Sequence, residues 1–256
     1  MKKILVSLIF GASILFGSET SKGADYIESF DNPSSINSWV EGYSTTLSHE
    51  EFEGDGVLSY SGIYFYKTID YKNNPFKLSW DNYITLLETQ NQNDLAWFDI
   101  GLIKSPGEFG PDLVMAGTLY SPGRDLEFAH GIRAKGGNQN IGANSDNLED
   151  FRGIWQHFEI DYDGDSIGLV TYNGKSDNLE NLVYTSRIGS NLKFTDMDKF
   201  GFRAIGGWPD IFTVRGYLDN VRFTEVPEPP TAILAGALSG ILSLTRRNNR
   251  KLKRQR

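Results

Sequence analysis

The sequence predicts an all-β protein: one antiparallel β-sandwich, with an N-terminal signal helix before it and a C-terminal hydrophobic helix after it. Two observations predict the sandwich. No long stretch of the chain shows the periodicity of an amphipathic helix. Instead, short runs rich in Tyr, Phe, Ile, Val and Trp alternate with segments of Gly, Asn, Asp, Ser and Pro, which is typical of strands and turns. A third observation, an apolar run near each end, predicts the two helices.

The first element is a signal peptide over residues 1–23. Lysines precede the apolar stretch 4–16, and small or polar residues follow it, which is the order of a secretory signal. We expect export through the Sec translocon, with cleavage after Gly23 or Ala24. The chain has no Cys, so lipoprotein processing is excluded and stability must come from packing or bound metal rather than from disulfides.

The sandwich is predicted to occupy residues 24–226. A hairpin is expected where Trp155–Tyr162, which alternates apolar and polar side chains, meets Asp163-Gly164, because Asp-Gly suits a tight turn. Leu119–Asp150 is rich in Gly and Asn, and we expect a long loop or an edge excursion there. The other predicted strands are Ile63–Tyr71, Phe76–Leu87, Leu95–Lys104, Ile167–Tyr172, Phe200–Ala204 and Phe212–Glu225.

Charge narrows the classes of function. Residues 24–228 hold fifteen Lys and Arg and thirty-two Asp and Glu, a net charge of −17, whereas the whole chain carries −8. So acidic a domain would repel phosphates, which argues against nucleic-acid binding. It is compatible with divalent cations or neutral glycans. A length of about 200 residues fits one domain with its own core.

The end of the chain has three parts. Pro227, Glu228 and Pro229 come first, and the prolines keep this triplet extended because they supply no backbone N–H. An apolar run at about 231–245 predicts a membrane helix, and a tail at 246–256 carries seven Lys or Arg and no acid. Fifteen helical residues span about 22 Å, less than the ~30 Å hydrocarbon core. The basic tail is expected to stay cytoplasmic under the positive-inside rule.

This three-part ending resembles the PEP-CTERM sorting signal of exopolysaccharide-producing Gram-negative bacteria, over residues 227–256. Pro230 is a departure, because Ser or Thr usually follows the triplet. The resemblance implies that a membrane-embedded exosortase cuts near Pro-Glu-Pro. The protein would be anchored in the inner membrane only until then, and would afterwards lie at the cell surface or outside the cell. The alternative is a plain C-terminal anchor.

The body resembles the concanavalin A-like (laminin-G-like) jelly roll. SFDNPSSINSWVEG (29–42) is similar to the first strand and turn of that family. WQHFEIDYDGDSIGLVTYNG (155–174) is similar to its central strand pair, and GYLDNVRFTEV (216–226) to its terminal strand. The resemblance covers most of residues 26–226 and implies a jelly-roll sandwich. It implies no single activity, because such sandwiches host many.

Glu159, Asp161 and Asp163 are the candidate catalytic residues. Alternate residues of a strand point to the same side, so the three carboxylates are expected to share one face. This pattern resembles the motif of glycoside hydrolase family sixteen, whose retaining enzymes have the same jelly-roll fold. Their motif is Glu-x-Asp-x-x-Glu or Glu-x-Asp-x-Glu. Here the last acid is the shorter Asp163 or is replaced by Gly164, which would misplace the proton donor. The alternative is a solvent-facing strand that ends in an Asp-Gly turn.

A structural calcium ion is the candidate cofactor. Many β-sandwich carbohydrate-binding domains join their first strand to their last through calcium. Glu28 or Asp31, near the start, and Asp219, near the end, are the candidate ligands. Asp219 equally suits a turn cap. The acids from Asp161 onwards do not form an EF-hand, because Ser166 stands where that loop requires Gly.

Trp208 and Asp210 are the candidate sugar-binding residues. Sugar binding usually needs an exposed aromatic ring beside amide or carboxylate groups, and the glycines and proline around Trp208 predict a surface loop. A packing role for Trp208 is the alternative. The remaining tryptophans are expected in the core: Trp39, Trp80, Trp97 and Trp155.

Together these features predict an exported, non-enzymatic protein of the cell surface or extracellular matrix that binds polysaccharide. Two alternatives stay open. One is a divergent glycoside hydrolase or lyase that uses Glu159 and Asp161. The other is a purely structural matrix protein without a ligand.

Overall fold

β-Strands make up nearly all the regular structure that the computed structural model describes. The described residues run from 25 to 226, apart from 43, 63, 72–73, 90–95, 105–112, 121–127, 137–138, 147, 190–193, 195–196 and 206–211. Gly23–Val226 forms one compact unit. The predicted signal peptide and the segment 227–256 lie outside the described residues. Within the described part, no helix is long and apolar enough to cross a membrane.

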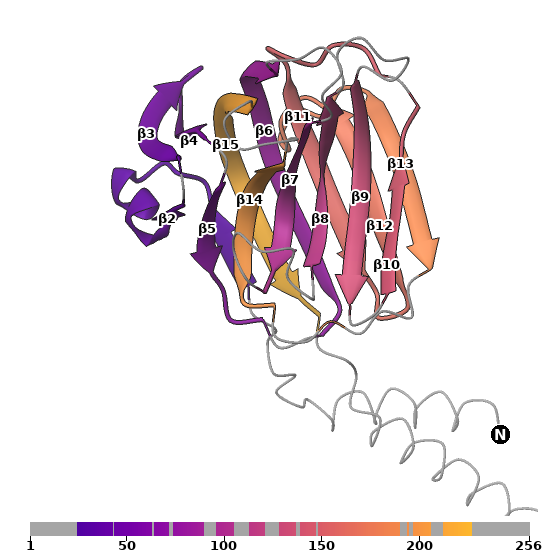
Figure 1. Ribbon diagram of the computed structural model, residues 1–256. Helices are drawn as coiled ribbons and strands as arrows, with labels where there is room; N and C mark the ends of the chain where they lie inside the picture. Colours follow the sequence, from indigo (N-terminus) through magenta and orange to yellow (C-terminus); the bar gives the residue numbers. More distant parts are fainter. Residues whose placement is uncertain are drawn as a thin grey trace, which may run out of the picture. The chain divides into compact units, whose positions relative to one another are not determined.

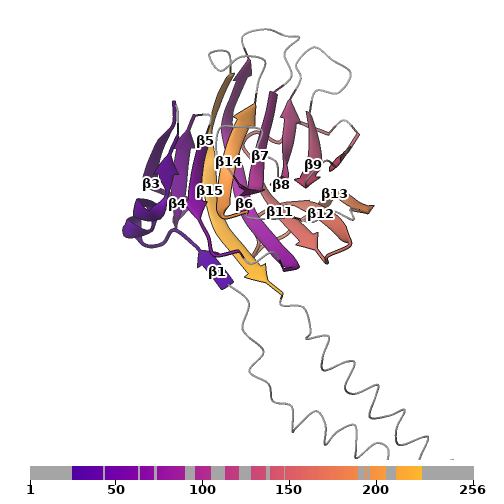
Figure 2. The same ribbon diagram turned by 60° about the horizontal axis from the view of Figure 1, so that its bottom comes forward.

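The strands form two antiparallel sheets (Figure 1). The larger sheet has the order β13-β12-β11-β6-β15-β4-β3, and β1 pairs with β15 beside this path (Figure 2). The smaller sheet has the order β10-β9-β8-β7-β14-β5-β2. The predicted antiparallel β-sandwich is therefore confirmed.

The bounds of the strands follow for each sheet. The larger sheet contains β1 (Asp25–Glu28), β3 (Thr46–Phe52), β4 (Asp55–Ser61), β6 (Phe76–Thr89), β11 (Trp155–Tyr162), β12 (Ser166–Asn173), β13 (Leu182–Gly189) and β15 (Phe212–Glu225). The smaller contains β2 (Val40–Glu41), β5 (Tyr64–Thr68), β7 (Ala96–Ile103), β8 (Leu113–Tyr120), β9 (Phe128–Gly136), β10 (Gln139–Asn144) and β14 (Lys199–Ile205).

Strand β6 shows how the sequence divides the two faces of the larger sheet. Leu78 and Trp80 are almost fully buried between the sheets. There Trp80 stacks on Phe158 of β11, with ring centroids 5.2 Å apart and ring planes 3° apart. The alternate positions must face the opposite way, away from the core. These outward residues of β6 are Lys77, Ser79, Asp81 and Tyr83.

Two predicted strands, Trp155–Tyr162 and Phe212–Glu225, are confirmed residue for residue, and the other predicted strands are found with shifted bounds. Of the two alternatives for Leu119–Asp150, the long loop is wrong, because β9 and β10 occupy much of this range, whereas the edge position fits, because β10 forms the edge of the smaller sheet. The glycines that indicated a loop instead permit close packing. A Cβ added at Gly131 would lie 2.3 Å from the side-chain oxygen of Asn144.

The segment 29–42 also differs from the expectation of a first strand and turn. It contains a 3-10 helix, η1 (Pro33–Ser38), followed by the short strand β2. Asn32 caps this helix, because its side-chain oxygen accepts a hydrogen bond of 3.0 Å from the backbone N–H of Ser34. Pro33 suits the first helical position, where no N–H is needed.

The tryptophans divide between the core and the outer surfaces. Trp39 and Trp80 lie in the core between the sheets, as predicted. Trp155 is buried but belongs to the outer face of the larger sheet, where the tip of the β3–β4 hairpin covers it: its Nε1 donates to Glu53 at 2.8 Å. Trp97 is half-buried, and the Arg133 guanidinium lies 5.3 Å from its ring centre.

Candidate functional site

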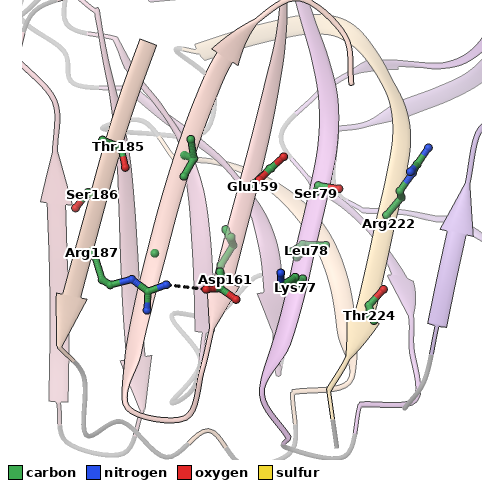
Figure 3. A pocket seen from close by; sticks show the side chains of 13 residues that line it. Lys77, Leu78, Ser79, Glu159, Asp161, Thr185, Ser186, Arg187, Arg222 and Thr224 are labelled. Atoms are coloured by element: carbon green, nitrogen blue, oxygen red, sulfur yellow. Dashed lines mark hydrogen bonds and ion pairs between the residues drawn. The ribbon is translucent and has the colours of Figure 1, made fainter. Parts of the chain in front are cut away.

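A groove with a volume of about 730 Å³ crosses the outer face of the larger sheet (Figure 3). Strands β6, β11, β12, β13 and β15 contribute the residues that line it. Outward positions of neighbouring strands meet there because side chains alternate between the two faces of a sheet. The charged lining residues are Lys77, Glu159, Asp161, Arg187 and Arg222.

Strand register arranges these side chains in rows. Glu159 lies opposite Ser79, and Ser79 lies opposite Arg222. In the next row, Asp161 lies opposite Lys77. Members of a row stand on adjacent strands, about 4.8 Å apart. The groove therefore has acidic side chains on β11 and basic side chains on β6 and β15.

His157 holds Glu159 in place. Its Nδ1 donates to Asp81 at 2.6 Å and its Nε2 donates to Glu159 at 3.1 Å, so the imidazole carries both protons. Burial acts to lower the pKa of His157, but the hydrogen bonds and charges of the two carboxylates outweigh it and raise this pKa to about 9. The hydrogen bond from His157 in turn lowers the pKa of Glu159, and the charges of His157 and Lys77 lower it further.

Arg187 binds the other two candidate acids. One guanidinium nitrogen lies 2.6 Å from Asp161 and the other lies 2.7 Å from Asp163. Asp163 also caps the β11–β12 turn, where it accepts hydrogen bonds from the backbone N–H groups of Asp165 and Ser166. Burial acts to raise the pKa of Asp163, but these hydrogen bonds and the Arg187 charge lower it to about 2.

The three candidate catalytic acids thus lie close together, and each pairs with a cation. A glycosidase needs a carboxyl group that holds a proton at working pH, which requires a raised pKa. The pKa of Glu159 is lowered instead, and Asp161 is engaged by Arg187. Carboxylates fixed in this way are suited to accepting hydrogen bonds from hydroxyl groups. The hydrolase alternative stays a prediction.

Asp219 belongs to a network next to the groove. Lys175 Nζ lies 2.7 Å from Asp219 and 2.6 Å from Asp55 at the β3–β4 tip. Burial raises the pKa of Asp219 to about 6, although the ion pair with Lys175 acts to lower it. The next residue, Ser176, donates its backbone N–H and its hydroxyl to Asp81, each at 3.0 Å. Two buried acids therefore fasten the segment after β12 to this face.

An aromatic cluster lies on the same outer face. Phe52 of β3 stacks on Tyr217 of β15 with ring centroids 4.3 Å apart, and Tyr83 of β6 lies 4.9 Å from Phe52. All three rings are half-buried, so part of each meets solvent. Along β6, Asp81 separates Tyr83 from Ser79 of the groove. The face therefore carries an aromatic section and a charged section within a few residues of one strand.

The candidate calcium ligands do not fit a metal site. Glu28 forms an ion pair with Lys67 at 3.3 Å, Asp219 is paired with Lys175, and Asp31 is exposed. Nowhere in the described ranges does a group of three or more His, Asp or Glu side chains have a geometry that could hold a metal ion. Protein cations already occupy two of the three carboxylates, and we derive no role for calcium from them.

Five other candidate residues lie outside the described part of the chain. These are Trp208 and Asp210, expected to bind sugar, and Pro227, Glu228 and Pro229, expected to direct sorting. Their roles stay predictions.

Sequence reasoning missed the basic side of the groove. Lys77 and Ser79 occupy alternate positions of a strand that was predicted. The alternation of side chains along a strand therefore already indicated that they share a face. Arg187 and Arg222 are different. They reach the groove only through the pairing of β13 with β12 and of β15 with β6, which no local pattern indicates.

No family model matches the chain, and no curated protein matches it in sequence. Solved structures do resemble it. The CBM2 module of the Lactobacillus casei BL23 phage J-1 evolved Dit has a TM-score of 0.50 and 10% identity, covering 81% of this chain and 100% of its own. A Lotus tetragonolobus seed lectin has a TM-score of 0.48 and 11% identity, covering 81% and 100%. The exoplasmic/lumenal domain of VIP36 has a TM-score of 0.49 and 12% identity, covering 81% and 90%. At such identities, the likeness to the phage module indicates a common fold and no function.

Proposed function

We propose that this chain binds polysaccharide in the outer-face groove. The observation that carries the proposal is the groove itself, an open volume of about 730 Å³ lined by charged side chains and hydroxyl groups on paired strands. Sugar hydroxyls both donate and accept hydrogen bonds, so a sugar site needs acceptors and donors at fixed positions. The groove offers both.

The acceptors are ordered before a ligand arrives. His157 fixes Glu159 and Arg187 fixes Asp161, yet the side chains of these two acids keep 48% and 43% of their surface exposed. Their remaining lone pairs can therefore receive hydrogen bonds from a ligand. Because the side chains are already held, binding loses less conformational freedom than it would with mobile side chains.

The aromatic cluster supports the same proposal. Sugar rings present apolar C–H faces that can lie on aromatic rings, and the partly exposed rings of Phe52, Tyr83 and Tyr217 provide such a surface. Between the groove and these rings, Ser176 lies on the buried Asp81, so a polysaccharide that contacts both sections would pass over the segment after β12. The proposal assigns the aromatic contact to these three rings, whereas the sequence indicated Trp208.

Filling the groove is expected to weaken binding at least tenfold. Ser79 stands between Glu159 and Arg222, so Ser79→Trp puts a large side chain into the middle of the groove while leaving the core side of β6 unchanged. Trp is well tolerated in strands. We expect the affinity of the full chain for its polysaccharide to fall at least tenfold, a loss of about 1.4 kcal/mol. Affinity electrophoresis against a panel of polysaccharides measures it.

The matched control is Thr68→Trp, an exposed position on β5 of the other sheet, which is expected to bind as the parent does. Both variants are checked for an unchanged unfolding temperature. Tight binding by a folded Ser79→Trp protein would remove the groove from consideration.

We also propose that the protein is exported and then sorted by an exosortase to the cell surface or extracellular matrix. The proposal is supported by the signal-peptide pattern at 1–23 and by the order of Pro-Glu-Pro, apolar run and basic tail at 227–256. The acidic domain lies between these two segments in the same chain. Binding of polysaccharide would give the sorted protein a role in an exopolysaccharide matrix.

Sorting predicts a processed C-terminus. In a host that encodes an exosortase, the parent is expected to lose its basic tail and leave the membrane fraction. Replacing Pro227, Glu228 and Pro229 by Ala together should leave the tail attached and the protein in the membrane. Peptide mass spectrometry of each fraction detects the difference, and Pro230→Ala serves as a neighbouring control. Equal loss of the tail from the triple variant and the parent would contradict cleavage directed by Pro-Glu-Pro, and retention of the tail by both proteins would favour a plain anchor.

A further inference from the structure

Two basic side chains of the groove form no ion pair with another described residue. Lys77 and Arg222 are exposed on neighbouring strands (Figure 3). Within the described residues, neither side chain makes an ion pair or a hydrogen bond. The charge of Lys77 does lower the pKa of Glu159. Glu159 already has its own hydrogen bond from His157.

The other cations near the groove are neutralised. Arg187 is shared by Asp161 and Asp163, His157 lies between Asp81 and Glu159, and Lys175 lies between Asp55 and Asp219. Lys77 and Arg222 differ from these paired cations, although residues 24–228 carry a net charge of −17 and acids are in excess. With acids in such excess, cations that remain unpaired at one place are available to a ligand.

The spacing of the two side chains suits anionic groups. Arg222 lies opposite Ser79, and Lys77 lies two residues before Ser79 on the same strand. Lys77 and Arg222 are therefore diagonal neighbours, about 7–8 Å apart at their Cα atoms, and both side chains are long. An Arg can bind a carboxylate or sulfate through two parallel hydrogen bonds, and Lys adds a compact charge.

We propose that the groove takes an anionic polysaccharide, whose carboxylate or sulfate groups bind to Lys77 and Arg222 while its hydroxyls bind to Glu159 and Asp161. This inference rests on the proposed polysaccharide binding. It differs from what the net charge alone indicated, which was compatibility with divalent cations or neutral glycans. The total charge of the domain describes its field at a distance, whereas the ligand meets the local charges of the groove.

The experiment measures binding of the full chain to polygalacturonate, which carries carboxylates, to dextran sulfate, and to neutral dextran. At low salt we expect at least one anionic polymer to bind about tenfold more tightly than dextran, and about 0.5 M NaCl to remove most of that difference. Preference for polygalacturonate or for dextran sulfate identifies the anionic group.

The decisive variant is Lys77→Ala combined with Arg222→Ala, which is expected to lower affinity for the preferred anionic polymer about tenfold. Arg215→Ala is the matched control, because Arg215 is an exposed arginine of the same strand that does not line the groove. Undiminished anionic binding by the double variant, or equal binding of dextran by the parent, would overturn the inference while leaving polysaccharide binding intact. Failure of the parent to bind any polysaccharide would refute the proposed function itself, and the inference with it.

Discussion

Replacing Asp81 by Ala is expected to lower the free energy of unfolding by about 3–5 kcal/mol, the usual effect of breaking a buried ion pair. The Asp81 side chain is fully buried. It accepts hydrogen bonds from His157 at 2.6 Å, from the Ser176 backbone at 3.0 Å and from the Asn220 amide at 2.7 Å. Its loss removes one of the two carboxylates that neutralise His157, and it takes the acceptor from the backbone N–H and hydroxyl of Ser176.

Urea unfolding of the parent and the variant measures the change. Asp198→Ala is the control, because the Asp198 side chain is 51% exposed and makes a surface ion pair with Lys199 at 2.6 Å. Such a pair contributes at most about 1 kcal/mol. If both variants lose the same small amount, the network around Asp81 does not hold this face together.

Stability is expected to fall as the pH rises from about 6.5 to 9. Hydrogen bonds and charges of Asp81 and Glu159, acting against burial, raise the pKa of His157 to about 9 in the folded protein. The unfolded value is about 6.5. A raised pKa adds stability that is fully present below the unfolded value and is lost as the pH passes through the folded value. Linkage converts this shift to about 3 kcal/mol.

The contribution of His157 is the difference in unfolding free energy between the parent and a variant without this histidine. Unfolding free energies of the parent and of His157→Gln are measured across the pH range, so that titrations common to both cancel. The parent's advantage is expected to be large at pH 6 and to shrink toward pH 9. A constant difference across this range would show that His157 is not a charged partner of Asp81 and Glu159.

Local sequence patterns predicted the strands whose apolar and polar residues alternate. Trp155–Tyr162 and Phe212–Glu225 were predicted with their observed bounds, since a period of two together with flanking turn residues marks a strand. Strand β9 was missed because its glycines resemble loop composition. Whether a glycine serves a turn or a close strand contact depends on the neighbouring strand, as Gly131 against Asn144 shows.

The sequence predicted which acids share a face of the sheet, but it did not predict their partners. Alternation along one strand correctly indicated that Glu159 and Asp161 share a face. What these acids do depends on their partners, and the cation that binds Asp161 comes from β13. Arg187 lies next to Asp161 because of the order of the strands, and this order is a property of the whole sheet. In the proposal, these two acids are fixed hydrogen-bond acceptors beside Lys77 and Arg222, whereas the sequence indicated a candidate acid–base pair, which stays a prediction.

The most direct test compares two variants in one binding measurement with the same polysaccharide. Ser79→Trp fills the groove, whereas Trp208→Ala removes the aromatic ring that the sequence indicated as a sugar platform. If the groove is the binding site, Ser79→Trp loses at least tenfold in affinity, about 1.4 kcal/mol, and Trp208→Ala stays close to the parent. Parent-like binding by Ser79→Trp together with a tenfold loss in Trp208→Ala would contradict it.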